Sequence, residues 1–511
     1  MIIKTILAMM TKNFFITKQA MRFWAIACLL VSPLSMMAEK FEVDGIRYEI
    51  TDDYSVSVIP GGNYSGQVVI PSNVTFYEKS YWVRAIGEKA FHSCKDLTSI
   101  VIPNSVRSID LHAFFLCTGL TSLEIPDGVQ TIGRFAFYGS GLQSVVIGKD
   151  VQSIGTGSFS DCKDLVSVAL PQKMKSVGSE LFANCAGLKS VSFGSGVTSI
   201  EEGAFLNCTS LESITIPKNV NTISPRVFEG CSKLKTLTFE YSNGYNLRLK
   251  SGSYSSNRVF YGCPIVTVNL NRNITYDGEK SPFEDINSLK NVVIGDDLYS
   301  IGNNMFRGCS CLSSLSLGKR LQEIGSSAFF NCRSLTSVDF PKSLSTIKEY
   351  AFFGCSGLTS LTIGADGNEY SHGYFHVGNH AFDSCFGLKS LNIKFVSAIE
   401  DNAFRGCTAI EEIRTCAEFP PAIYSSSFDE ETVRSATLHV PVPSLSDQSK
   451  YREAMYWKDF FHIVEDLPSS IHVTDINTED AGCIYDLQGR KVTTPKKNGL
   501  YIQGGKKYIY R

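Results

Sequence analysis

The chain has 511 residues, of which 43% are hydrophobic and 19% are charged, with 48 basic residues against 50 acidic ones. The formal net charge of -2 excludes the electrostatic attraction on which nucleic-acid binding and general binding to anionic membranes depend. We therefore expect a folded chain with no nucleic-acid partner.

The N-terminal segment differs in composition from the rest of the chain. A leader containing Lys4, Lys12 and Lys18 is followed, after Arg22, by the apolar stretch FWAIACLLVSPLSMMA, which small residues close around Ala38. This pattern predicts a secretory signal peptide over residues 1–38. A membrane anchor is the alternative, although the apolar stretch is shorter than the ~20 residues that a span requires. No later segment is apolar enough to cross a bilayer.

One pattern, with a phenylalanine at its centre, recurs between residues 86 and 428, and most of its steps are 22 to 24 residues long. A fixed period in the twenties is typical of a solenoid, in which each unit buries its apolar face only against its neighbours. The phenylalanine falls at Phe91, Phe114, Phe137, Phe159, Phe182, Phe205, Phe228, Phe260, Phe283, Phe306, Phe329, Phe352, Phe382, Phe404 and Phe428.

A single unit, IGSSAFFNCRSLTSVDFP over residues 324–341, predicts two elements. The alternation in LTSVDFP predicts a short strand with Leu335 and Phe340 pointing inward. The preceding IGSSAFFNC places Phe329 and Cys332 at helix-like spacing, which predicts a short helical turn. The fold class is therefore an α/β solenoid of about 15 units, with a parallel β-sheet on one face and short helical turns on the other.

These residues resemble the leucine-rich repeats of BspA-like bacterial surface proteins, in which Ile-Gly, Ala-Phe, Cys, Leu and Ile-Pro follow one another. The resemblance covers residues 86–428. Residues 39–85 resemble the N-terminal capping strands of that family, and residues 429–467 resemble its closing strand and helix. The resemblance implies a non-catalytic, exported protein that binds other proteins.

Twelve of the 16 cysteines occupy the same place in the repeat. Twelve equivalent copies indicate a structural role, because a catalytic group is normally present once, and cysteine packs as a small hydrophobic residue. We predict buried free thiols, since stacked side chains project in parallel whereas a disulfide needs facing Cβ vectors. A disulfide framework is the alternative in an exported protein. The twelve are Cys94, Cys117, Cys162, Cys185, Cys208, Cys231, Cys263, Cys309, Cys332, Cys355, Cys385 and Cys407. The predicted repeat core is represented by Phe91, Cys94, Leu97, Phe329, Cys332 and Leu335.

The chain contains none of the sequence motifs of hydrolases, zinc peptidases or nucleotide-binding enzymes, so we expect no enzyme activity and no cofactor. One histidine cluster, HGYFHVGNH, has His372, His376 and His380 four residues apart. On a helix these rings could hold zinc. Gly373 and Gly378 weaken a helix there, so we predict a polar loop and no metal site.

The outward strand positions are small and mostly uncharged, which favours a flat surface for protein contact. They include Val101, Glu124, Val146, Ala169, Ser192, Thr215, Thr238, Val293, Ser316, Asp339 and Thr362.

Two units also carry insertions rich in aromatic residues, and insertions in repeat arrays often form binding loops. The candidate partner-binding residues are Tyr241, Tyr245, Tyr254, Tyr370, Tyr374 and Phe375. Deleting residues 241–256 or 369–378 is expected to weaken binding without changing the melting profile. The alternative is that both insertions only pack on the solenoid.

Residues 471–511 form a separate unit, in which IYDLQGRKV and GLYIQGGKKYIYR read as strands with a hairpin turn at Gly504 and Gly505. This unit resembles the short C-terminal domain of exported Bacteroidetes proteins. That resemblance implies sorting or attachment at the cell surface, and an autonomous β-hairpin cap is the alternative.

Together these features predict a secreted or cell-surface protein, exposed outside the outer membrane. We expect a non-catalytic scaffold that adheres to a host or extracellular-matrix protein. A glycan-binding accessory protein that uses the aromatic insertions is the alternative.

Overall fold

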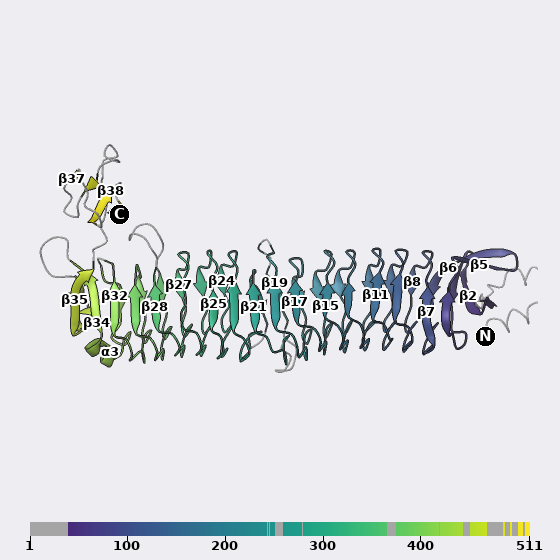
Figure 1. Ribbon diagram of the computed structural model, residues 1–511, viewed down its shortest axis with the longest axis horizontal. Helices are drawn as coiled ribbons and strands as arrows, with labels where there is room; N and C mark the ends of the chain where they lie inside the picture. The colour runs from purple at the N-terminus through teal and green to yellow at the C-terminus, as the bar shows by residue number, and fades with distance from the viewer. Residues whose placement is uncertain are drawn as a thin grey trace, which may run out of the picture. The chain divides into compact units, whose positions relative to one another are not determined.

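The computed structural model describes residues 39–510 except 243, 245, 251–258, 278–279, 365–374, 418, 443–449, 468–483, 486–490, 493–498 and 504–505. Two compact units divide the chain, Met1–Ser158 and Phe159–Arg511, and within each the strands of successive turns follow one another in chain order (Figure 1). The predicted signal peptide, residues 1–38, lies outside the described residues. Within the described ranges, no helix has the length and apolar character of a membrane span.

Most turns contribute two strands, a long one and a short one of two or three residues. In the first unit the long strands are β7 (Leu97–Val101), β9 (Ser122–Ile125) and β11 (Ser144–Ile147). The short ones are β8 (Ser108–Ile109), β10 (Thr131–Ile132) and β12 (Ser153–Ile154).

The second unit continues the same alternation. Its long strands are β13 (Ser167–Ala169), β15 (Ser190–Ser192), β17 (Ser213–Ile216), β19 (Thr236–Phe239), β21 (Thr267–Leu270), β23 (Asn291–Ile294), β25 (Ser314–Ser316), β28 (Ser360–Ile363), β30 (Ser390–Ile393), β32 (Glu412–Thr415), β34 (Thr437–Pro441) and β35 (His462–Leu467). Its short strands are β14 (Ser176–Val177), β16 (Ser199–Ile200), β18 (Thr222–Ile223), β20 (Leu247–Leu249), β22 (Ile274–Tyr276), β24 (Ser300–Ile301), β26 (Glu323–Ile324), β27 (Thr346–Ile347), β29 (His376–Val377), β31 (Ala398–Ile399) and β33 (Ala422–Ile423).

Both kinds of strand pair in parallel with their counterparts in the next turn. In the second unit, the long strands form the sheets β17-β19-β21-β23-β25 and β28-β30-β32-β34-β35, and the short strands form β14-β16-β18-β20-β22 and β24-β26-β27-β29-β31-β33. Equivalent residues face each other, as Leu361 and Leu391 do in β28 and β30. The prediction of a parallel sheet is therefore confirmed, but the long and the short strands form separate parallel sheets instead of one.

The first turns are preceded by six strands, β1 (Lys40–Val43), β2 (Ile46–Asp52), β3 (Ser55–Val58), β4 (Gly66–Val69), β5 (Asn73–Phe76) and β6 (Lys79–Ile86). Antiparallel pairs join β1 to β2, β2 to β3, and β5 to β6. Parallel pairs join β6 to the short strand β8 and β4 to the long strand β7. The N-terminal strands thus extend the short-strand sheet through β6, while β4 and the first long strand, β7, form a two-stranded sheet.

The last turns are covered by a short α-helix, α3 (Glu430–Ser435), and two 3₁₀ helices, η1 (Lys450–Arg452) and η2 (Trp457–Asp459). Trp457 is fully buried, its ring centroid lies 6.0 Å from that of Phe428, and its Nε1 donates a hydrogen bond to the carbonyl of Pro421 at 2.8 Å. This indole therefore covers the end of the phenylalanine stack.

Four C-terminal strands, β36 (Ile484–Tyr485), β37 (Lys491–Val492), β38 (Gly499–Gln503) and β39 (Lys506–Tyr510), form an antiparallel sheet in the order β37-β36-β38-β39. Gln503 pairs with Lys506, so two residues separate the paired strands of the hairpin. Gly504 and Gly505, where the hairpin turn is predicted, lie outside the described residues.

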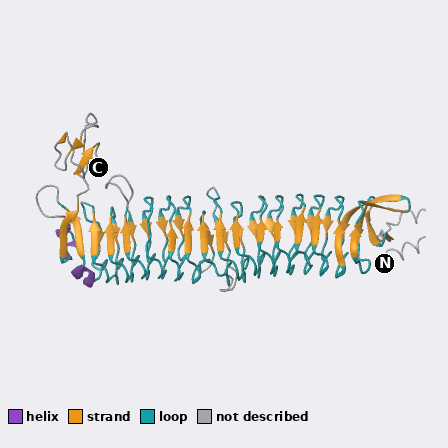
Figure 2. Ribbon diagram, viewed as in Figure 1, coloured by secondary structure: helices purple, strands orange, loops and turns teal. Residues whose placement is uncertain are grey.

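The predicted helical turns are wrong. The segments between short and long strands are turns and loops, and the helices of the described residues lie near the last turns (Figure 2). The unit that contains Phe329 shows why. Ser327 and Asn331 have φ values of 53° and 58°, in the left-handed region, which a right-handed helix cannot include.

Hydrogen bonds to the next turn replace those of a helix in this segment. The backbone N–H groups of Phe329 and Asn331 donate to the carbonyls of Ala351 and Phe353, at 2.8 and 2.7 Å. The N–H group of Cys332, the next residue along the chain, donates back to the carbonyl of Phe329 at 3.2 Å. Because donors alternate between the two directions, the buried backbone is satisfied without helical bonds.

The strand predicted at residues 335–341 is also absent, although its burial alternates as expected, with Leu335 and Val338 buried and Asp339 exposed. The long-strand sheet is interrupted here, between β25 and β28. Phe340 stands where the next turn has the smaller Ile363, and its ring lies edge-on to the ring of Phe352, with centroids 5.7 Å apart. A phenylalanine at this position does not by itself break the sheet, because Phe239 occupies it in β19, which pairs with β17 and β21.

Phenylalanine, cysteine and leucine form the core of each turn. Phe91, Cys94, Leu97, Phe329, Cys332 and Leu335 are all buried. The phenylalanine rings of successive turns stack with centroids 5.0 to 5.1 Å apart in the first unit and 5.1 to 5.7 Å apart in the second.

Ten of the repeat cysteines also donate a hydrogen bond to the phenylalanine carbonyl of the previous turn. The thiol of Cys332 donates to the carbonyl of Phe306 in the previous turn, with Sγ to O at 3.3 Å, and Cys355 does the same to Phe329 at 3.2 Å. Cysteine therefore supplies a small apolar volume together with a weak donor for a buried carbonyl. The cysteines that the structure describes are free thiols, and Cys311 is exposed while Cys416 is half-buried.

We predict that the repeat thiols react with an alkylating reagent only slowly in the native protein and completely after denaturation. Burial raises the pKa of Cys117 to about 12, so the reactive thiolate is scarce as well as inaccessible. Mass spectrometry of samples alkylated before and after unfolding measures the labelling of the native and of the denatured protein. Exposed Cys311 is the internal control and should label at once. Poor labelling after unfolding would indicate disulfides.

Candidate functional site

The structure describes two of the six candidate partner-binding residues, and these two differ in how much of the residue is exposed to solvent. Tyr241 is 45% exposed. Phe375 is only 2% exposed, so its proposed role in partner contact is wrong. Phe375 directly precedes β29 (His376–Val377) and belongs to the core. Tyr245, Tyr254, Tyr370 and Tyr374 lie outside the described residues.

Deleting either insertion is not the clean test that the sequence suggested. Residues 241–256 include β20, whose Leu247 and Leu249 are buried, and residues 369–378 include the buried Phe375 and Val377. Such deletions would remove core side chains, so point substitutions are needed.

Two of the clustered histidines are paired with carboxylates. His376 lies on β29, with its Nε2 2.9 Å from Glu400 Oε1, and His380 Nδ1 lies 2.7 Å from Asp383 Oδ2. His372 lies outside the described residues. In the part of the chain that the structure describes, no group of three or more His, Cys, Asp or Glu residues could hold a metal ion.

Exposed Tyr241 borders a pocket of ≈ 350 Å³, which we call the Arg272 pocket. Its walls come from the corners that follow four successive long strands, β19, β21, β23 and β25. They are formed by Tyr241, Ser242, Gly244, Asn271, Arg272, Asn273, Asp297, Tyr299 and Arg320.

The repeat sequence explains why a pocket lies at this corner. In neighbouring turns an aliphatic residue stands three positions before the buried isoleucine of the short strand, as Val220 and Leu298 do, and it is buried. The register of β18, β20 and β22 puts Asn246 and Asn273 at that position. Two successive turns therefore lack the aliphatic side chain that fills the corner elsewhere.

The side chain of Arg272 enters this corner and is 4% exposed. Its Nη1 donates to the carbonyls of Val220 and Lys218, at 2.7 and 3.2 Å. Its Nε and Nη2 are buried and have no hydrogen-bond partner, and the same holds for Asn273 Oδ1. Burial lowers the pKa of the Arg272 guanidinium to about 10, against the influence of the Glu240 carboxylate, so the group is still cationic at neutral pH.

Two tyrosines and an ion pair form the outer part of the pocket. Tyr241 and Tyr299 are 45% and 40% exposed. Arg320 pairs with Asp297 at 3.1 Å, and its guanidinium lies over the Tyr299 ring at 4.8 Å from the centroid and donates to the Tyr299 hydroxyl. Arg320 and Asp297 thus satisfy each other, whereas Arg272 keeps two unpaired donors.

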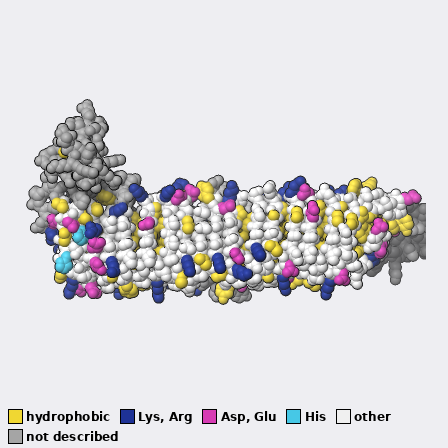
Figure 3. All heavy atoms as spheres, viewed as in Figure 1, with side chains coloured by type: hydrophobic (Ala, Val, Ile, Leu, Met, Phe, Trp, Pro, Cys, Tyr) yellow, Lys and Arg dark blue, Asp and Glu magenta, His cyan; other side chains and the backbone are white. Residues whose placement is uncertain are grey.

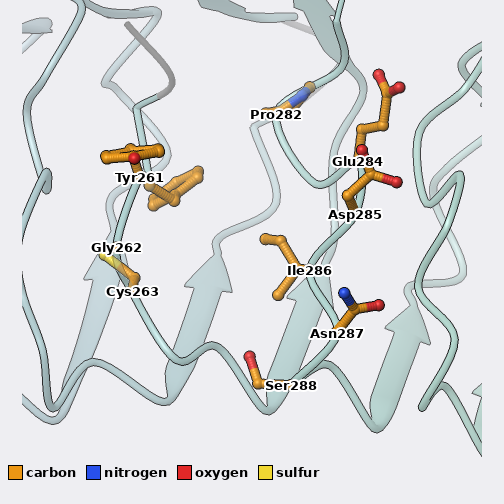
Figure 4. Close-up of a pocket in the computed structure, with 10 residues that line it drawn as sticks. Tyr261, Gly262, Cys263, Pro282, Glu284, Asp285, Ile286, Asn287 and Ser288 are labelled. Atoms are coloured by element: carbon orange, nitrogen blue, oxygen red, sulfur yellow. The ribbon is translucent and has the colours of Figure 1, made fainter. Parts of the chain in front are cut away.

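A second pocket, of ≈ 240 Å³, lies among the turns that precede the long strands (Figure 4). Tyr261, which is 55% exposed, and Asp285 belong to its lining, and Ile286 occupies the place that cysteine has in most turns. A third, of ≈ 300 Å³, lies where the long-strand sheet is interrupted, between Ser337 and Gly364. Buried polar atoms without a partner do not occur among the described lining residues of either pocket.

Arg272 was missed from the sequence, although a signal was present. The corner segment reads LNRNI at residues 270–274, where other turns have Pro or Gly, two mostly polar residues and then an aliphatic residue, as in IPKNV at residues 216–220. Asn271 in place of Pro or Gly, and Asn273 in place of the aliphatic residue, mark an exception in the repeat.

Two parallel strands per turn, stacked around a buried Phe-Cys-Leu core, define the class of protein: a leucine-rich-repeat β-solenoid. The chain belongs to the family described as BspA type leucine rich repeat region, whose model matches residues 84–209, 130–249, 278–411 and 368–452. No curated protein matches the sequence.

Several solved structures are similar to the chain. A leucine rich cell surface protein from Faecalibacterium prausnitzii is 26% identical, with a TM-score of 0.40 over 75% of this chain and 96% of that one. A leucine-rich repeat protein from Bacteroides ovatus is 24% identical, with a TM-score of 0.43 over 78% and 99%. The pneumococcal vaccine antigen PcpA is 18% identical, with a TM-score of 0.31 over 84% and 99%.

Proposed function

We propose that the chain is an exported, non-catalytic binding scaffold, secreted or held outside the outer membrane, that mediates adhesion to host or other cell-surface proteins. Leucine-rich repeat proteins generally bind other proteins through the surface that their repeats build. The observation that carries the proposal is the exposed long-strand face. In the second unit it presents, one per turn, Ala169, Ser192, Thr215, Thr238, Val293, Ser316, Asp339 and Thr362.

These positions suit contact with a folded protein. All but one are uncharged, and most of the face seen in Figure 3 consists of uncharged polar side chains and backbone. A partner could therefore approach without removing water from many charges, which is a large cost in protein association. The absence of a dense charge cluster on this stripe also predicts binding that salt weakens only modestly.

Within this proposal the ends of the chain have separate roles. Residues 1–38 direct export, residues 39–85 and 429–467 cap the repeats, and residues 471–511 sort the protein or attach it to the cell surface. Analysis of the mature protein by mass spectrometry, combined with surface proteolysis of intact cells, tests all of these assignments.

Adding a charge to the long-strand face is expected to weaken binding to the protein partner about tenfold or more, because an unpaired charge at an interface is costly. Thr215→Glu and Ser316→Glu make this change on β17 and β25. Partners are first captured with the full chain from extracellular-matrix proteins, and affinity is then measured by biolayer interferometry.

Ser176→Glu is the matched control, since Ser176 is exposed on the short strand β14 and carries the same change to another face. Equal affinity of all three variants and the parent would exclude the long-strand face. Failure of every matrix protein to bind would refute adhesion to such proteins.

Glycan binding is a second candidate function, favoured by the Arg272 pocket. Two exposed tyrosines beside amide, carboxylate and guanidinium groups provide both ring faces and planar hydrogen-bonding groups, which suit a sugar. A glycan array separates this function from the first.

A further inference from the structure

We propose that the Arg272 pocket binds a sugar acid, whose carboxylate pairs with Arg272. This inference rests on the second proposed function, glycan binding, and names the class of sugar. The pocket volume of ≈ 350 Å³ lies within the range of small-molecule sites, roughly 300–1,000 Å³.

The first argument is the position of the unpaired donors on Arg272. Nε and Nη2 point to the same side of a guanidinium group and form the fork that accepts both oxygens of a carboxylate. Nη1, on the other side, is already used by the carbonyls of Val220 and Lys218. The side chain is therefore fixed through one nitrogen, while the pair that recognises carboxylates is left without a partner.

The second argument is the cost of this arrangement. A buried cation with unpaired donors is destabilising, and an aliphatic residue fills the same corner in neighbouring turns. If packing alone mattered, an aliphatic residue would serve here as well. The acidic groups near the pocket are engaged elsewhere: Asp297 pairs with Arg320, and Glu240 accepts a bond from the Lys218 N–H. An anion from outside would neutralise Arg272.

The third argument distinguishes a sugar acid from an acidic side chain of a peptide. The buried polar atoms without a partner include an acceptor, Asn273 Oδ1, as well as the donors of Arg272, and both residues line the pocket. A ligand that satisfies both needs a carboxylate and a hydroxyl close together, as sugar acids have. The carboxylate of Asp or Glu offers acceptors only. Tyr241 and Tyr299, at the rim, supply ring faces for the sugar.

Binding of four monosaccharides to the purified full chain tests the proposal, with saturation-transfer NMR as the readout. D-glucuronic and D-galacturonic acids are compared with D-glucose and D-galactose, and N-acetyl-L-glutamate represents an acidic side chain. We expect the two acids to bind roughly tenfold to a hundredfold more tightly than the neutral sugars, the value of charged hydrogen bonds.

Arg272→Leu replaces the buried guanidinium by an aliphatic side chain and should abolish this preference while the circular dichroism spectrum is retained. Arg272→Lys keeps the charge without the planar fork, and it should weaken binding of the acids. This variant carries the test if the leucine variant does not fold. Arg248→Gln is the matched control, because Arg248 lies on the neighbouring β20 but is exposed and paired with Asp277.

Each other result overturns the proposal in a different way. Equal binding of neutral and acidic sugars, lost in Tyr299→Ala, would leave glycan binding intact and refute the acid. Preferential binding of N-acetyl-L-glutamate would refute the claim that the ligand is a sugar. Absence of saturable binding by all four sugars would refute glycan binding together with this inference. Unchanged preference in both Arg272 variants would exclude Arg272.

Discussion

The protein is expected to lose stability steeply as the pH rises above about 9, in reducing buffer. Burial raises the pKa of nine repeat thiols above the ordinary value of 9.0, and that of Cys117, Cys208 and Cys309 to about 12, whereas a hydrogen bond with Cys263 and then burial raise the pKa of Cys231. Between these values the folded chain keeps protons that the unfolded chain releases. The contribution of each thiol is therefore complete below the unfolded pKa and is lost as the pH rises.

The expected effect is large because the same group is repeated. Each thiol that stays protonated in the folded chain lowers the free energy of unfolding by about 1.4 kcal/mol for every pH unit above its unfolded pKa. With ten such thiols, the free energy of unfolding falls more steeply with pH than in an ordinary domain with one buried cysteine. Since a repeat array need not unfold in one step, the turns should be lost in groups.

Urea unfolding followed by circular dichroism, at pH values from about 7 to about 10, measures this slope. Tyrosine and lysine also titrate in this range, so the comparison is with the double variant Cys208→Ala, Cys231→Ala, which lacks two adjacent thiols. The free energy of unfolding of the turns that contain these two positions should depend less steeply on pH in the variant. The difference should correspond to about two protons. Identical slopes for parent and variant would show that the thiols do not govern alkaline unfolding.

Burial in the core could be predicted from the sequence because it depends on a pattern that repeats. Phe329, Cys332 and Leu335 recur at constant offsets, and a side chain that recurs once per turn must face its copies in the adjacent turns. The direction of alternation at residues 335–339 was predictable for the same reason. None of this requires knowledge of the backbone path between the offsets.

The backbone path itself could not be predicted in the turn segments. Ser327 and Asn331 adopt left-handed backbone angles without being glycine, and hydrogen bonds to residues 349–353 of the next turn stabilise them. Helix-like spacing of apolar residues carries no information on such bonds. The short strands, such as β26, could not be predicted from the sequence either, because two residues become a strand only through pairing with the neighbouring turns.

The candidate pocket shows the limit of reasoning from insertions. Exposure of Tyr241 followed from its place in an insertion, but Phe375 lies in another one and is buried. Whether an inserted aromatic residue faces solvent depends on where the strand resumes, which only the pairing register fixes. Arg272 lies outside both insertions, and its importance follows from atoms left unpaired, which no sequence pattern reports.

Replacing Phe329 by alanine is expected to destabilise the protein by ~3 to 5 kcal/mol, the usual cost of removing a buried aromatic side chain. The ring is fully buried between those of Phe306 and Phe352, with centroid distances of 5.5 and 5.1 Å. Its backbone carbonyl accepts the thiol of Cys355 from the next turn, so a shift of Phe329 disturbs that turn as well.

The damage should spread mainly to adjacent turns, because each turn of a solenoid contacts only its neighbours. Amide hydrogen exchange measured by mass spectrometry should therefore rise around residues 300–360 and change little near residue 200. Phe330→Ala is the matched control: Phe330 is half-buried and stacks on Phe353 at the surface, with the Arg307 guanidinium 4.0 Å from its ring centroid, so a smaller effect is expected. Faster exchange throughout the second unit, equal at residue 200 and residue 330, would mean that the turns unfold as one body and would contradict the nearest-neighbour account of their stability.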